Sequence, residues 1–183
     1  MQIKRFNDNW TFNIGEGDAF MAARNGATDS GNFIPLPHDA MIHEERRTDA
    51  PSGSQSGFYP GGFYTYQKYF DVPLEYKDKH LLLEFEGVYM NAKVYVNEHL
   101  AGGHPYGYSN FYGDLDDFLD YGKTNRIRVI ANNANEPNSR WYSGSGIYRD
   151  VNLLIGEKVR IPQNGVRITT KDIKENLALL EIK

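Results

Sequence analysis

The sequence predicts an all-β fold, a β sandwich or jelly roll, from three observations. Several short segments alternate apolar and polar side chains, which is the period of half-buried strands. Gly, Pro, Asn and Asp separate these segments, as they separate the strands of sandwiches. The 2 Trp, 13 Tyr and 10 Phe residues favour strands, because a pleated surface accommodates aromatic rings. The pattern shows no strand-helix-strand rhythm, so a parallel α/β sheet is not expected.

The strands can be placed in order along the chain. The clearest is the aromatic run 62–70, which ends before Pro73, a residue that cannot donate a hydrogen bond to a ladder. Four further strands are expected at 81–86, 92–97, 126–131 and 147–155. The residues assigned to the interior or to strand contacts are Tyr64, Tyr66, Phe70, Leu81, Leu83, Phe85, Ala92, Val94, Val96, Ile127, Val129, Val151, Leu153 and Ile155.

Turns and loops are expected between these strands. Asn97-Glu98 stands where a hairpin turn would reverse the chain, and residues 102–108 are expected to form a loop. Residues 18–62 are polar and show little period of either kind, and loops of this length are usually functional or disordered. Within them, the charges of residues 44–47 are expected to be a solvated surface, because adjacent opposite charges gain little in water.

A second domain is expected to begin after residue 157. The strand pattern restarts there, and the sequence ends within an apolar strand at 177–183. An isolated pair of strands is marginally stable and its edge invites aggregation. We therefore expect residues 1–157 to form one domain and residues 158–183 to be the truncated start of another.

Composition excludes several classes of protein. The 20 Lys and Arg against 24 Asp and Glu give a net charge of −4, so nucleic acid, which is bound by clustered cations, is not an expected partner. No apolar run approaches the roughly 18–20 residues that span a bilayer, so a membrane protein is not expected. With 0 Cys there is neither a disulfide framework nor a thiolate metal site. The first residues lack the apolar core of a secretory signal, and a cytoplasmic location is expected.

Four motifs follow one another in a fixed order. They are Leu36-Pro37-His38-Asp39, residues 61–70 (GGFYTYQKYF), residues 85–97 (FEGVYMNAKVYVN) and residues 140–151 (RWYSGSGIYRDV). Each motif is weak alone, but the four in this order are specific. Over roughly residues 6–155 the chain resembles the N-terminal sugar-binding domain of glycoside hydrolase family 2, the family of β-galactosidases, β-glucuronidases and β-mannosidases.

The resemblance implies a jelly-roll sandwich of the galactose-binding type, then an immunoglobulin-like sandwich opened by residues 158–183, then a (β/α)₈ barrel. In the family that barrel carries both catalytic carboxylates. The parent would be a retaining O-glycosyl hydrolase of terminal β-linked sugars that needs no cofactor. A β-galactosidase is preferred and a β-glucuronidase is the alternative. The implied partners are a carbohydrate, the barrel of the same chain and, for the full-length parent, further copies in a homo-oligomer.

The acidic residues supply no persuasive catalytic pair. Retaining glycosidases need two carboxyl groups about 5–5.5 Å apart. Glu84 and Glu86 share one face of a strand and are expected to be solvated, as are Asp114, Asp116, Asp117 and Asp120 in a turn or short helix. His104 lacks partners at metal-ligand spacing. We therefore expect no catalytic residue, no metal site and no hydrolase activity in this chain alone.

Three residues are expected, through the resemblance, to line the sugar pocket of the intact enzyme: Asp39, Arg140 and Trp141. The carboxylate of Asp39 can accept charge-assisted hydrogen bonds from sugar hydroxyls, and an Asx turn or loop cap is its alternative. Trp141 offers a flat apolar face to a pyranose or, equally, a core anchor, whereas Arg140 is hard to place in a core. Gly144 and Gly146 are expected to permit positive φ or close backbone approach.

Two other classes of function compete with an enzyme domain. A free-standing carbohydrate-binding module would use the same three residues in a shallow independent site. A purely structural domain would only stabilise the barrel and the oligomer. A natural stop directly after Lys183 would eliminate the enzyme domain, and titration of galactose and glucuronate into the isolated chain distinguishes the other two, because tight binding favours a module.

Overall fold

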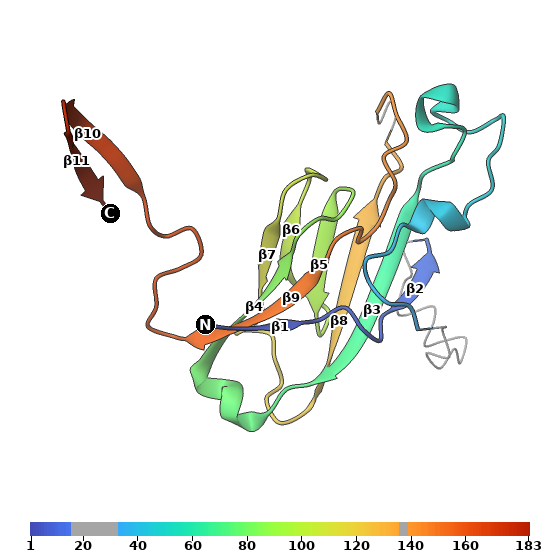
Figure 1. Ribbon diagram of the computed structural model, residues 1–183. Coiled ribbons are helices and arrows are strands. Elements are labelled where there is room, and N and C mark those ends of the chain that lie inside the picture. The colour runs from blue at the N-terminus through green and yellow to red at the C-terminus, as the bar shows by residue number, and fades with distance from the viewer. Residues whose placement is uncertain (16–32, 136–138) are drawn as a thin grey trace.

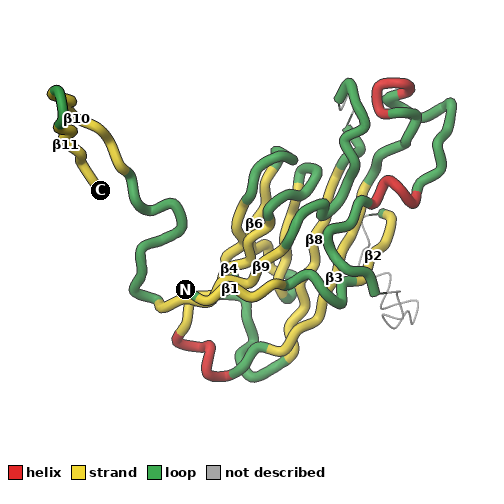
Figure 2. The backbone as a smooth tube through the Cα atoms, viewed as in Figure 1, coloured by secondary structure: helices red, strands yellow, loops and turns green. Residues whose placement is uncertain are grey.

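The computed structural model describes residues 1–15, 33–135 and 139–183, and it has the all-β sandwich that the sequence predicts (Figure 1). Its strands are β1 (Gln2–Arg5), β2 (Thr11–Ile14), β3 (Phe63–Asp71), β4 (Lys79–Phe85), β5 (Ala92–Val96), β6 (His99–His104), β7 (Phe111–Asp114), β8 (Thr124–Asn132), β9 (Val151–Glu157), β10 (Ile168–Lys174) and β11 (Leu177–Ile182). The helices of the described residues are short 3₁₀ turns between strands (Figure 2): η1 (Ala40–His43), η2 (Gly53–Ser56) and η3 (Leu74–Asp78). None of these described helices has the length and apolar character needed to cross a bilayer.

Two antiparallel sheets form the layers of the sandwich. One has the strand order β2-β3-β8-β5-β6 and the other the order β1-β9-β4-β7. β3 pairs with β8 along its whole length, from Phe63 opposite Asn132 to Asp71 opposite Thr124. Consecutive strands such as β3 and β4 lie in different sheets, while β4 pairs with the distant β9. This crossing between sheets is the jelly-roll arrangement.

The core between the sheets consists of the alternating side chains that the sequence singles out. Tyr66 of β3, Phe85 of β4 and Ile127 of β8 are fully buried. All the other residues assigned to the interior are buried as well, except Phe70, which is half-buried against the core. Burial contributes about 1.5–3 kcal/mol for each large apolar side chain. A register slip of one residue would expose a whole row, so the alternation fixes the pairing of the strands.

The hairpin turn expected at Asn97-Glu98 is confirmed. It joins β5 to β6, and both residues have positive φ, 45° for Asn97 and 69° for Glu98. Positive φ at both central positions is the signature of the turn type that matches the twist of antiparallel strands. The side-chain oxygen of Asn97 also accepts a hydrogen bond from the backbone N–H of Arg126, at 2.9 Å, so the turn is attached to β8.

The expected loop at residues 102–108 is wrong over its first three residues, because β6 continues to His104. Two glycines make this possible. A Cβ on Gly102 would lie 2.9 Å from the carbonyl oxygen of Tyr112, and one on Gly103 would lie 2.6 Å from that of Ala92. The two glycines thus allow the edge strand β6 to lie close to the backbone of both β5 and β7. In the sequence, adjacent glycines indicate a loop, which is why the strand was not predicted this far.

β10 and β11 form a two-stranded antiparallel sheet of their own, which stands apart from the sandwich in Figure 1. Its apolar side chains are exposed: Ile173 is 71% and Leu177 is 79% exposed. The division into a domain 1–157 and the start of a second domain at 158–183 stays a prediction. Of the long polar segment 18–62, residues 18–32 lie outside the described residues.

Candidate functional site

Two long connections meet at one end of the sandwich and carry the residues expected to bind sugar. The connection from β2 to β3 is described over residues 33–62, and the connection from β8 to β9 includes residues 139–150. Backbone hydrogen bonds of 2.8 Å join them, from the N–H of His38 to the carbonyl of Ile147 and from the N–H of Ala40 to the carbonyl of Ser145. In Figure 1 the two connections rise together beyond the ends of β3 and β8.

Asp39 is the centre of this junction. It is the N-cap of η1, and its Oδ1 accepts hydrogen bonds from the backbone N–H of Met41, at 3.0 Å, and of Ser145, at 2.9 Å. Its Oδ2 accepts a hydrogen bond from the Tyr142 hydroxyl at 2.6 Å. The capping function considered for Asp39 is therefore present. A carboxylate has about four acceptor positions, so these three bonds leave roughly one for a ligand.

Tyr142 is the partner that the sequence argument missed. Its ring packs edge-on against Tyr59, with centroids 5.2 Å apart, and the Arg46 guanidinium lies 5.9 Å from the Tyr59 centroid. Partial burial and then the hydrogen bond to Asp39 raise the pKa of Tyr142 above its usual value. The hydroxyl therefore stays a donor at neutral pH. The available signal was its place beside Trp141 in the fourth motif.

Trp141 lies on the surface. Its side chain is 59% exposed, which rules out the core-anchor alternative, and its indole Nε1–H donates to the Tyr108 hydroxyl at 3.1 Å. Arg140 is exposed too, as expected. The structure thus connects Asp39 with Tyr142 and Trp141 with Tyr108. The three predicted residues lie on the two connections that meet at this end of the sandwich, which are called the rim below. They do not form one hydrogen-bonded cluster.

Two glycines shape the loop that reaches Asp39, as predicted. Gly144 has φ +68°, and a Cβ there would lie 2.9 Å from Oδ2 of Asp39. Gly146 has φ +95°, and a Cβ there would lie 2.0 Å from the Tyr66 hydroxyl. Between them, Ser145 is buried, and its Oγ accepts a hydrogen bond from Nδ2 of Asn133 at 2.5 Å. Close packing of this backbone therefore holds the Asp39 carboxylate in place.

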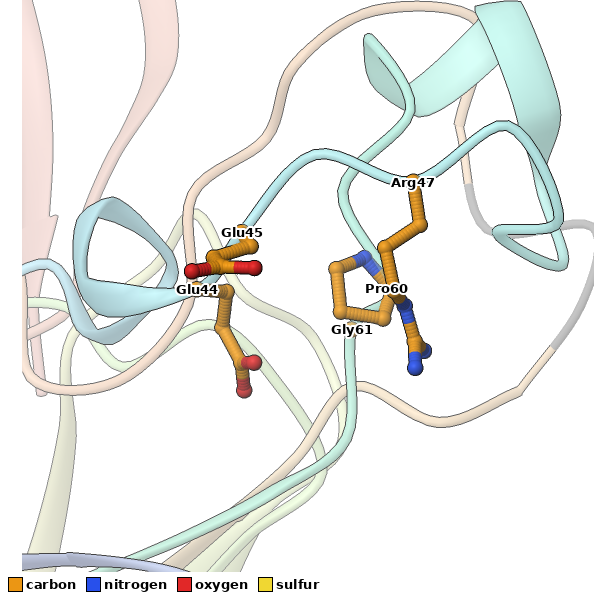
Figure 3. Close-up of a pocket in the computed structure, with 5 residues that line it drawn as sticks. All are labelled: Glu44, Glu45, Arg47, Pro60 and Gly61. Atoms are coloured by element: carbon orange, nitrogen blue, oxygen red, sulfur yellow. The ribbon is translucent and has the colours of Figure 1, made fainter.

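A polar pocket opens beside η1 on the same connection. It has a volume of about 430 Å³ and is lined by Glu44, Glu45, Arg47, Pro60 and Gly61 (Figure 3). Figure 3 shows the Glu44 carboxylate and the Arg47 guanidinium on either side of Pro60. Glu45, Arg46 and Arg47 are exposed, as the sequence predicts, and Glu44 is half-buried. Charged walls of both signs suit hydroxyl-rich ligands, which donate and accept hydrogen bonds.

Arg46, within the same charged segment, has a structural function. Its Nε–H donates to the carbonyl of Gly57 at 2.8 Å, which ties the segment after η1 to the end of η2. Its guanidinium also lies over Tyr59, which packs against Tyr142. Arg46 therefore connects this segment to η2 and to the tyrosine ring that packs against Tyr142.

Asp116, in the turn that follows β7, is not the solvated residue that the sequence predicts. Asp116 Oδ2 lies 2.6 Å from Nδ1 of the buried His80, and Oδ1 accepts from the N–H of Leu81 at 2.7 Å. Asp114 Oδ1 accepts from the N–H of Asp116 at 3.1 Å. Within the described residues, His80, Asp114 and Asp116 are the group whose ligand atoms lie close enough, within 4.8 Å, for a metal ion. Their mutual bonds fasten the end of β7 to β4, so Asp116 is a structural residue and not the solvated surface expected.

The fold and the rim define a class of protein. A jelly-roll sandwich whose loops gather a fixed carboxylate, exposed aromatic rings and a polar pocket at one end is an arrangement that suits a carbohydrate-binding domain. Comparison with known families agrees. The chain belongs to the glycosyl hydrolases family 2, whose sugar binding domain matches residues 55–156.

Individual relatives are similar along most of the chain. A β-galactosidase of Bacteroides ovatus, BoGH2A, is 39% identical over 178 residues, which are 97% of this chain and 21% of the relative. A β-glucuronidase of Bacteroides fragilis is 32% identical over 163 residues, 85% of this chain and 21% of the relative. The crystal structure of a family 2 member from Bacteroides cellulosilyticus superposes with a TM-score of 0.82 at 32% identity, covering 100% of this chain and 24% of that one. The chain thus spans about a fifth to a quarter of the length of these relatives.

Proposed function

We propose that the chain is the N-terminal domain of a retaining O-glycosyl hydrolase, preferably a β-galactosidase, with a β-glucuronidase as the alternative. Asp39, Arg140 and Trp141 line the sugar pocket, and a catalytic barrel in the same polypeptide completes it. The two carboxyl groups that perform the chemistry, about 5–5.5 Å apart in a retaining enzyme, belong to that barrel. β10 and β11 open an immunoglobulin-like domain between the two, and the intact protein is a homo-oligomer.

The Asp39 carboxylate carries this proposal. Two backbone N–H groups and the Tyr142 hydroxyl fix its orientation, while the residue remains partly exposed. A carboxylate held by its own scaffold loses little freedom when a sugar hydroxyl donates to it. Such a charge-assisted bond is directional, so it selects one hydroxyl position of the sugar. The preference for a β-galactosidase rests on the 39% identity with a relative of that name.

Turnover of two glycosides tests the proposal. The 183-residue chain and the full reading frame that contains it are each assayed on 4-nitrophenyl β-galactoside and 4-nitrophenyl β-glucuronide. We expect turnover only by the longer protein, faster on the galactoside and with retention of anomeric configuration by NMR. Activity of the short chain, or none of the longer one on either glycoside, would contradict the proposal. Tight binding of galactose by the short chain would favour a free-standing module instead.

The part played by Asp39 is tested in the same longer protein. Asp39→Asn keeps an oxygen for the backbone N–H groups but removes the charge, and we expect kcat/KM to fall about tenfold or more. Asp49→Asn is the matched control, because that carboxylate is 80% exposed on the same connection. Equal kcat/KM values for the two variants would show that Asp39 does not bind the sugar.

A further inference from the structure

Three exposed aromatic rings, Tyr106, Tyr108 and Trp141, make one continuous surface, called here the aromatic platform. The side chains are 58%, 45% and 59% exposed, respectively. Trp141 Nε1–H donates to the Tyr108 hydroxyl at 3.1 Å, and the rings of Tyr106 and Tyr108 are 5.6 Å apart in an edge-on arrangement. Two separate connections, β6 to β7 and β8 to β9, supply these rings. Exposed apolar groups gathered in this way mark binding surfaces.

The platform rests on a rigid base. A Cβ on Gly107, between the two platform tyrosines, would lie only 2.2 Å from the ring of Tyr89, which is 4% exposed. The Tyr148 hydroxyl donates to the carbonyl of Gly107 at 2.7 Å. Tyr89 also packs edge-on against Tyr108, with centroids 5.2 Å apart. The backbone that carries Tyr106 and Tyr108 is therefore fixed, and a ligand need not order it.

The side chains of the platform indicate which class of ligand it binds. Each ring offers an apolar face and one hydrogen-bonding group, a phenol hydroxyl or an indole N–H, which matches the alternating C–H and hydroxyl surface of a pyranose. The platform side chains Tyr106, Tyr108 and Trp141 are uncharged, so they offer no cation of their own to pair with an anionic sugar. The platform itself therefore suits a neutral ligand better than an anionic one. The match to a sugar binding domain covers Tyr106 and Tyr108, and also Trp141.

We propose that the aromatic platform binds a neutral β-linked oligosaccharide and takes the sugar units that follow the terminal one. This rests on the proposed function, in which Asp39 contacts the terminal sugar. Trp141 lines the pocket of the terminal sugar in the proposed function and is also one end of the platform. The next residue, Tyr142, is bonded to Asp39, so the two surfaces adjoin at Trp141. The chain then discriminates by substrate length as well as by the identity of the end sugar.

The two tryptophans make the 183-residue chain its own probe. Trp10 is completely buried in the core and Trp141 is 59% exposed, so a change confined to the exposed emitter reports on the platform. We titrate β-1,4-galactotetraose, galactose and tetragalacturonate, and follow emission and iodide quenching. The tetraose is expected to shield Trp141 from iodide and to bind at least about tenfold more tightly than galactose, which corresponds to about 1.4 kcal/mol. Tetragalacturonate is expected to bind at least about tenfold more weakly than the tetraose.

Variants separate platform binding from other causes of the signal. Tyr106→Ala is expected to weaken tetraose binding about tenfold and to leave galactose binding unchanged. Tyr108→Phe keeps the ring and is expected to stay within about threefold. Tyr69→Ala is the matched control, because Tyr69 is 50% exposed on β3, outside the platform. The emission of Trp10 verifies folding in each case.

Four results would overturn the platform: no tetraose binding, equal affinity for tetraose and galactose, equal affinity for tetragalacturonate, or a Tyr106→Ala variant that binds like the control. These outcomes are independent of the glycoside assays. Turnover by the longer protein without platform binding would refute the platform alone. Platform binding with a longer protein inactive on both glycosides would refute the proposed function alone.

Discussion

The Asp39 carboxylate and the Tyr142 hydroxyl are joined by a hydrogen bond of 2.6 Å across 103 positions of sequence. This contact links the cap of η1 to the connection between β8 and β9, so the two long loops form one structure. The same carboxylate is bonded through Oδ1 to the backbone of both loops. These side-chain bonds add to the two backbone hydrogen bonds between the loops, so the relative position of the loops is already fixed before a ligand binds.

Removing the Tyr142 hydroxyl is expected to cost stability. Tyr142→Phe keeps the ring against Tyr59 but deletes the donor to Asp39. Because the side chain is 42% exposed, water replaces part of the lost bond, and we expect the free energy of unfolding to fall by about 1 kcal/mol. Urea denaturation measures the difference.

The neighbouring ring provides a control for this substitution. Tyr59→Phe also removes one phenol hydroxyl at the same aromatic contact, but not the one bonded to Asp39. We expect its free energy of unfolding to stay within about 0.5 kcal/mol of the native value. Equal losses for the two variants would mean that the Asp39–Tyr142 bond contributes no specific stability.

Stability is expected to fall in alkali because of two buried tyrosines of β3. Burial is the largest cause that raises the pKa of Tyr64 and of Tyr66 above its ordinary value. The unfolded chain releases both protons near pH 10, while the folded chain keeps them. The folded state then binds more protons, so the free energy of unfolding decreases above about pH 10, by up to about 1.4 kcal/mol per pH unit for each tyrosine. Denaturation at pH 8, 10 and 11 measures this slope, and a flat profile would contradict it.

The same two tyrosines are expected to differ at neutral pH. The Tyr66 hydroxyl is hydrogen-bonded to Nδ1 of His38 at 2.9 Å. The Tyr64 hydroxyl makes no hydrogen bond of normal geometry among the described residues, although Ser145 and Glu44 lie close enough to act on its pKa. Tyr66→Phe should therefore cost about 1 kcal/mol, while Tyr64→Phe should cost less. Both substitutions should reduce the alkaline slope. A larger loss at pH 7 for Tyr64→Phe would reverse this assignment.

Much of the fold could be predicted because local pattern and burial agree. β8 alternates in sequence and in structure, and its inward residues form part of the core. In β4 the inward residues Leu81, Leu83 and Phe85 also belong to the core, but His80 and Leu82 on the other face are buried as well. The turn at Asn97-Glu98 could be placed because Asn tolerates positive φ at the first central position, while Glu98 adopts a φ of 69° that is unusual for its type. The extent of β6 was missed, because its glycines serve a close backbone approach that is visible only once β5 and β7 are in place.

The candidate site was predictable only in part, because its bonds join distant residues. The fourth motif drew attention to Trp141, but whether that ring faced the core or solvent depended on where the loop folds. The bond from Tyr142 to Asp39 and the one from Trp141 to Tyr108 span two loops each, and no local spacing encodes them. The same reason explains why the sequence places Asp116 among solvated residues: its partner His80 lies on β4, 36 positions earlier in the chain.

Gly146 is expected to tolerate no side chain. Its φ is +95°, and an added Cβ would lie 2.0 Å from the hydroxyl oxygen of the buried Tyr66. Gly146→Ala should therefore lower the free energy of unfolding by at least about 3 kcal/mol, from backbone strain together with overpacking. Gly15→Ala is the matched control, because Gly15 has φ +109° but open space around its Cβ position, and should cost only about 1–2 kcal/mol. Thermal and urea denaturation of both variants separate the two effects, and equal losses would show that contact with Tyr66 adds nothing.

The bond between Asp116 and His80 is expected to stabilise the sheet that carries β4 and β7. Asp116→Asn leaves an acceptor for the Leu81 N–H but replaces the carboxylate oxygen that lies 2.6 Å from Nδ1 of the buried His80. Weakening a charge-assisted bond to a buried group should lower the free energy of unfolding by about 1–3 kcal/mol. Asp117→Asn, at an exposed neighbouring position, should stay within about 0.5 kcal/mol of the native value. Because Oδ1 of Asp114 and both carboxylate oxygens of Asp116 already have partners within the chain, we expect EDTA to leave the urea midpoint unchanged. A midpoint that falls in EDTA and recovers with an added divalent cation would show instead that these side chains hold a metal.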